Sequence, residues 1–238
     1  IHKYVMDMNP KDKKGWTPLH EAAHEDHLKV CQLILESAGD KNPGDESGCT
    51  PLHLAAQEGH IRIVAAFYEE IDDKNPADHD GWTPLHWAIQ RGHVDVCRLI
   101  LSKTNDKNPK FDHGNTLLHL VVDAGEVEVC KLLLQNAADK NPANEDPGDQ
   151  GETPLHKAAK NGHVKICKLI LENVVVKCPI THKGITPLHC SARSGHSETC
   201  EMILQNIDKE EASMQSFKCY VCRKELKTKV TFSFYIEQ

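Results

Sequence analysis

The chain has 238 residues, of which 39% are hydrophobic and 26% are charged, a balance typical of a folded globular protein and not of a disordered one. Its formal net charge of −7 argues against nucleic acid as the main partner, because a phosphate backbone is bound by clustered basic side chains. The longest apolar stretches, such as residues 63–68, are far too short to span a bilayer, so we expect no membrane insertion.

The first predicted helices follow a recurring four-residue motif, Thr-Pro-Leu-His. The motif begins at Thr17, Thr50, Thr83, Thr153 and Thr186, and Thr116 begins the variant Thr-Leu-Leu-His. The successive spacings are 33, 33, 33, 37 and 33 residues. Threonine is a good N-cap and proline suits the first helical position. Each motif therefore predicts the start of a short helix.

A second helix is predicted after each first one. A Gly-His pair turns the chain at Gly59, Gly92, Gly162 and Gly195. An apolar run with helical spacing follows each pair, and an excursion punctuated by Asn-Pro and glycine leads to the next threonine. One such helix pair cannot bury its apolar face alone, so the copies must stack.

The 33-residue period with Gly-x-Thr-Pro-Leu-His-x-Ala resembles the ankyrin repeat family. The resemblance covers about residues 7–208. It implies an all-α solenoid of helix-turn-helix units with β-hairpin-like fingers. We expect an array over residues 1–210, made of a partial repeat at 1–10 and six repeats from about residue 11, and a separate tail over 211–238.

Two repeats depart from the pattern. Repeat four has Leu117 in place of proline and Val121-Val122 in place of an alanine pair, and the finger after it is four residues longer. We predict that repeats four and five meet at an altered angle. Repeat six carries Ser197 and Thr199 where repeat three has valines, and a more polar second helix suits the end of a stack.

Cysteine and histidine follow the repeat and do not predict a metal or catalytic site. One position of the second helix is occupied by Cys31, Cys97, Cys130, Cys167 and Cys200. We expect these to be small buried hydrophobic residues, in a reducing compartment such as the cytoplasm or the nucleus. Eleven of the 16 histidines recur at two repeat positions, where the resemblance implies structural hydrogen bonds. The chain has no catalytic motif, so we expect no enzymatic activity and no cofactor.

The resemblance implies a binding surface on a concave face made of the fingers and first helices. The matching positions are Lys13, Lys14, Trp16, Glu46, Cys49, His79, Asp80, Trp82, Trp87, Arg91, Asp112, His113, Asn115, Glu152, Lys183 and Ile185. Two interpretations of Trp16 and Trp82 stay open: either they anchor a partner, or they pad the finger against the next helix. As anchors two repeats apart, they would contact an extended partner.

The tail has a different composition. It contains one Cys-x-x-Cys, at Cys219 and Cys222, and then an alternating apolar pattern over residues 230–236. The alternation predicts a short strand. The cysteine pair is half of a zinc site, so the second interpretation is an incomplete zinc module, which would need further ligands to bind metal or nucleic acid.

The sequence thus predicts a non-catalytic, monomeric interaction scaffold that binds a protein or an extended peptide on its concave face. The alternative is a regulatory or substrate-recruiting segment of a larger protein, such as an ion channel, a kinase or a ubiquitin ligase. The first residue, Ile1 in place of methionine, motivates this alternative.

Overall fold

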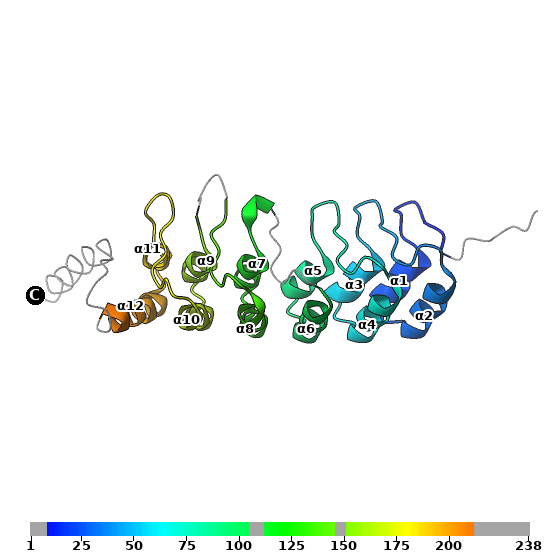
Figure 1. Ribbon diagram of the computed structural model, residues 1–238. Coiled ribbons are helices and arrows are strands. Elements are labelled where there is room, and N and C mark those ends of the chain that lie inside the picture. Colours follow the sequence, from blue (N-terminus) through cyan, green and yellow to red (C-terminus); the bar gives the residue numbers. More distant parts are fainter. Residues whose placement is uncertain (1–8, 105–111, 146–150, 212–238) are drawn as a thin grey trace, which may run out of the picture.

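Six helix pairs stand side by side along the chain (Figure 1). The computed structural model describes residues 9–104, 112–145 and 151–211. The pairs are α1 (Pro18–His24) with α2 (Leu28–Ser37), α3 (Pro51–Gln57) with α4 (Ile61–Glu70), α5 (Pro84–Gln90) with α6 (Val94–Lys103), α7 (Leu117–Ala124) with α8 (Val127–Asn136), α9 (Pro154–Asn161) with α10 (Val164–Asn173), and α11 (Pro187–Arg193) with α12 (Ser197–Glu211).

The first and second helices form two rows, and the fingers project beyond the row of first helices (Figure 1). The fingers are closed by hairpin-like backbone hydrogen bonds, such as Asp45 N to Cys49 O at 2.9 Å and Asp78 N to Trp82 O at 2.8 Å. The finger of repeat four contains a short 3-10 turn, η1 (Asp112–Gly114). The predicted all-α solenoid with hairpin-like fingers is confirmed.

The helix boundaries follow the predicted signals. Thr17 has an extended backbone (φ −115°, ψ 163°), and proline occupies the first turn of α1. The turn between the helices needs a left-handed residue, and Gly59 supplies it with φ +79°. A Cβ on Gly59 would lie 2.6 Å from Nδ1 of His93, so both the backbone conformation and the space require glycine. Repeat one uses Asp26 at this position, with φ +58°.

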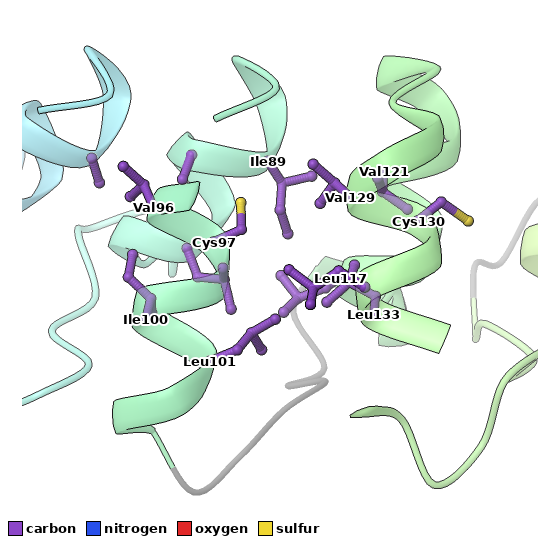
Figure 2. Packing of buried hydrophobic residues seen from close by; sticks show 14 of the residues in the cluster. Ile89, Val96, Cys97, Ile100, Leu101, Leu117, Val121, Val129, Cys130 and Leu133 are labelled. Carbon is purple, nitrogen blue, oxygen red and sulfur yellow. The ribbon is translucent and has the colours of Figure 1, made fainter. Parts of the chain in front are cut away.

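One apolar core runs through the described array, from Leu19 to Ile207. Figure 2 shows its passage from repeat three to repeat four, where Ile89 and Leu101 lie in one cluster with Leu117 and Val129. Each helix packs on the equivalent helix of the next pair. The core is therefore continuous from repeat to repeat, and each helix pair completes the burial of its apolar face against its neighbours.

The departures in repeat four are accommodated inside this core. Leu117, Val121 and Val122 are all fully buried. The altered angle between repeats four and five stays a prediction. Residues 146–150 of the long finger lie outside the described residues, as do residues 1–8, most of the tail, and Cys219 and Cys222.

Two expectations for the second helices need correction at repeat six. Cys31, Cys97, Cys130 and Cys167 are buried as predicted, but Cys200 is only half-buried, and its Sγ lies 3.0 Å from Oγ of Ser191. Thr199 was expected on a solvent-facing surface, yet it is 1% exposed. It takes the inward position that Val96 has in repeat three, so the polar substitution does not expose the helix there.

Candidate functional site

The predicted binding residues occupy the fingers and the adjoining parts of the first helices, with different degrees of exposure. The exposed side chains are those of Lys13, Lys14, Glu46, His79, Asp80, Arg91, His113 and Lys183. The half-buried side chains are those of Trp16, Trp82, Trp87, Asn115 and Ile185. We call the surface formed by these thirteen residues the finger face. Asp112 belongs to η1, and its side chain is outside the described part.

Cys49 and Glu152 are corrections, because each is only 8% exposed and offers little surface to a partner. Their carbonyl groups face the preceding repeat. The Nε2–H of His20 donates to Cys49 O at 3.1 Å, and that of His119 donates to Glu152 O at 3.2 Å. The same bond is made to the residues before two other motif threonines, Trp82 and Ile185, whose side chains are half-buried.

Four of the motif histidines connect adjacent repeats through their ring nitrogens. In His20, Nδ1 accepts the N–H of Thr17 at 3.1 Å, while Nε2 must carry the proton, because its partner Cys49 O can only accept. His53 and His156 make the same bonds to Trp82 O and Ile185 O, both at 3.0 Å. Burial lowers the pKa of His20, His53 and His156 below the usual 6.5, which keeps the neutral form that these bonds need.

The turn histidines add a second set of connections that the sequence interpretation did not specify. Nε2 of His60 donates to His24 O at 2.9 Å, and Nε2 of His93 donates to Gln57 O at 2.8 Å. Each bond joins a second helix to the end of the preceding first helix. The ends of the first helices, which adjoin the finger face, are therefore held by hydrogen bonds as well as by apolar packing.

The finger tips are held by aspartates that the sequence analysis missed. In repeat three, Oδ1 of Asp78 accepts the backbone N–H groups of Asp80 at 3.0 Å and of Trp82 at 2.8 Å. Asp12 and Asp45 cap their own fingers in the same way. An aspartate three residues before the finger glycine is a recognisable Asx-turn signal.

Neighbouring fingers are also joined through their backbones. Glu46 N donates to Lys14 O at 3.2 Å, His79 N to Ser47 O at 2.9 Å, and Glu145 N to His113 O at 2.8 Å. The side chains at the tips are thus displayed on a hydrogen-bonded framework, which limits how much order they must gain when a partner binds.

Trp16 has the geometry of a structural residue. Its ring stacks on that of His20 with centroids 5.8 Å apart and an interplanar angle of 20°. Its Nε1–H donates to Oδ2 of Asp45, in the next finger, at 3.1 Å. The half-buried ring therefore braces the first finger against the second, which fits the padding interpretation.

Trp82 and Trp87 form a different arrangement. Their ring centroids are 5.5 Å apart and their planes meet at 62°. Trp82 comes from the finger and Trp87 from α5, and both line a surface hollow together with Asp78, Asp80 and Gln90. This is the position on the finger face where aromatic surface borders an open depression.

A second hollow lies between the loops of repeats five and six and is more apolar. Its lining includes Val175, Val176 and Ile180, which are 91%, 62% and 62% exposed. Other repeats have the polar Asp-Lys-Asn-Pro sequence in this loop. The lining of this hollow contains none of the predicted binding residues.

The described part of the chain contains neither a metal-binding cluster nor a membrane-spanning helix. Within residues 9–104, 112–145 and 151–211, no group of three His, Cys, Asp or Glu residues is arranged to hold a metal ion. None of the helices in this part of the chain combines the length and the apolar character needed to cross a membrane.

Comparisons with known proteins agree with the repeat pattern. A family model described as ankyrin repeats (3 copies) matches residues 1–76, 64–144 and 140–213. A solved ankyrin repeat domain from Acinetobacter baumannii AYE is 26% identical, with a TM-score of 0.69, over 79% of this chain and 97% of that chain. A search of curated proteins finds no match.

Proposed function

Because this chain belongs to the ankyrin repeat family, we propose that it is a non-catalytic scaffold that holds a protein or an extended peptide on its finger face. Ankyrin repeats are in general protein–protein interaction modules. The observation that carries the proposal is the finger framework: tips with different side chains are joined by backbone hydrogen bonds between repeats one and two, two and three, and four and five.

The side chains along this framework favour a partner of mixed charge. The first finger presents Lys13 and Lys14, the second presents Glu46, and the third presents Asp80. Charged side chains on exposed tips contribute more to the orientation and association rate of a partner than to its affinity. Affinity has to come from partly buried aromatic surface, which is concentrated at Trp82 and Trp87.

We extend the proposal to the setting in which the scaffold acts. The five buried free thiols suit a reducing compartment, the cytoplasm or the nucleus. The net charge of −7 disfavours nucleic acid as a partner, and the array needs no second copy to complete its finger face. A substrate-recruiting or regulatory role within a larger protein would use the same face.

Affinity purification with two matched variants tests the proposal. The finger variant replaces Lys14, Glu46 and Asp80 by serine and Trp87 by leucine, the residue that repeats two and four carry at this position. The control variant replaces Arg62, Arg98 and Lys131 by serine, on exposed positions of α4, α6 and α8. Partners bound by the natural chain are expected to be lost from the finger variant and kept by the control.

Both variants first need circular dichroism spectra and unfolding midpoints close to those of the natural chain. Equal retention of the same partners by the two variants would remove the finger face as the binding surface. Failure of the natural chain to retain any protein above a bead control would contradict the scaffold function itself.

A further inference from the structure

The hollow of repeat three has two aromatic walls. Trp82 and Trp87 pack edge to face, with their planes at 62°, and both side chains line the depression. Trp82 also packs against His86, with centroids 5.7 Å apart. Indole faces carry the negative end of a quadrupole, and a cation within about 6 Å of the ring centre is attracted to them.

Two carboxylates complete the lining. Asp78 is held in place, because Oδ1 accepts the N–H groups of Asp80 and Trp82, and Oδ2 accepts Nε1–H of Trp87 at 3.3 Å. Asp80 is exposed at the tip. Among the residues that the structure describes, neither carboxylate has an ion-pair partner. The lining of the hollow therefore combines two carboxylates with two indole rings.

We propose that this hollow binds the ammonium head of a lysine side chain, with methylation of the nitrogen increasing the affinity. The inference rests on the proposed function, because the lysine belongs to the polypeptide that the finger face holds. An aromatic pair beside acidic groups attracts a cation through both the ring faces and the carboxylate charge.

The hydrogen bonds of Asp78 explain the preference for a methylated ammonium. A carboxylate offers about four acceptor positions, and Asp78 already uses three of them. It therefore supplies charge but little hydrogen-bonding capacity. Methylation keeps the positive charge, removes N–H donors that would need acceptors, and adds apolar surface for contact with the indoles. Arginine is less well matched, because its planar group needs several acceptors at once.

The arrangement occurs in repeat three and not in the neighbouring repeats. At the position of Trp87, repeats one, two and four carry Glu21, Leu54 and Leu120. Trp16 shares the finger position of Trp82, but the first helix of its repeat carries Glu21 in place of a second tryptophan. The protein thus contains its own comparison site, with one tryptophan in place of two.

Indole NMR signals of the full chain test the proposal. The chain has three tryptophans, so nitrogen-15 labelling of tryptophan gives three indole signals, which single substitutions assign. The probes are the N-acetyl amides of trimethyllysine, lysine and norleucine, the last a neutral side chain of similar length. Trimethyllysine is expected to shift the Trp82 and Trp87 signals saturably in the millimolar range and to leave Trp16 unchanged; lysine is expected to bind several-fold more weakly.

Two substitutions sharpen the test. Trp87→Leu introduces the residue that repeats two and four carry at this position, so folding is expected to survive, and an unchanged Trp16 signal checks it. Binding of trimethyllysine is expected to weaken by about tenfold or more. Asp80→Asn is expected to weaken it by about two- to fivefold, while Glu46→Gln, on the adjacent finger, is the matched control and is expected to have no effect.

The proposal is overturned if norleucine shifts the two signals as trimethyllysine does, if no probe shifts them, or if Trp87→Leu binds like the natural chain. None of these outcomes depends on the protein partner. A negative NMR result would therefore leave the scaffold proposal standing. Conversely, if the natural chain retained no protein in the affinity experiment, the NMR titration would still show whether the hollow binds an ammonium group.

Discussion

The buried motif histidines make the stability of the array depend on pH. His86 and His119 are at most 1% exposed, and burial lowers the pKa of each from 6.5 to about 4. In the unfolded chain both imidazoles regain a pKa of about 6.5. Below pH 6.5 the unfolded state therefore binds more protons than the folded state, and acid favours unfolding.

The size of the effect follows from these two values. The contribution of each histidine is fully present above about pH 6.5 and falls progressively until the pH reaches about 4. At pH 5 the loss is about 2 kcal/mol for each of the two residues. The pKa values of His20, His53 and His156 are lowered in the same direction, so they add to it. A typical domain is stable by only about 5–15 kcal/mol.

The assay is urea unfolding followed by circular dichroism at pH 7.5 and pH 5. The natural chain is expected to lose several kcal/mol of unfolding free energy between these conditions. His119→Gln is expected to be less stable at pH 7.5 but to lose about 2 kcal/mol less on acidification. His79→Gln, which removes an exposed histidine from a finger tip, is the control. Unfolding free energies that do not change with pH, or a folded His119 that titrates near pH 6.5 by NMR, would refute the reasoning.

Three further predictions concern packing. Gly59→Ala is expected to lower the free energy of unfolding by about 2–3 kcal/mol, because the new Cβ meets the His93 ring. Gly81→Ala, at φ +80° with nothing within 4 Å of the new Cβ, is expected to lower it by only about 1–2 kcal/mol through backbone strain. Equal unfolding midpoints for the two variants would contradict the packing account. Burial raises the pKa of the Cys97 thiol to about 12, so thiol labelling followed by mass spectrometry is expected to modify half-buried Cys178 well before Cys97. Removal of repeat six uncovers α9 and α10 and is expected to lower the soluble yield more than removal of residues 213–238 does; similar yields would count against it.

Much of the architecture can be predicted from the sequence, because it depends on local and periodic signals. Thr17 and its equivalents mark helix starts, Gly59 marks a turn, and Cys31 follows the apolar spacing of a second helix. Each of these features is decided within a few residues of the chain. Six copies in register then determine the stack, since a single pair cannot bury its apolar face.

Contacts between repeats decided the rest. Cys49 and Glu152 looked like surface residues, but both side chains are buried in the stack, and their carbonyl groups accept hydrogen bonds from histidines 29 and 33 residues away in the preceding repeat. Trp16 and Trp82 are indistinguishable in their motifs, Gly-Trp-Thr-Pro. Trp16 reaches Asp45 of the next finger, whereas Trp82 meets Trp87 of its own repeat.

The sequence by itself therefore determined the family and the helical solenoid, and it predicted the positions of a binding surface. The tertiary structure decided which of those positions are exposed, and that the side chains of Asp78, Trp82 and Trp87 meet around one hollow. The physical reason is distance along the chain: caps and turns are local, but the exposure of a finger side chain depends on the residue that faces it from the next finger or from the helix behind it.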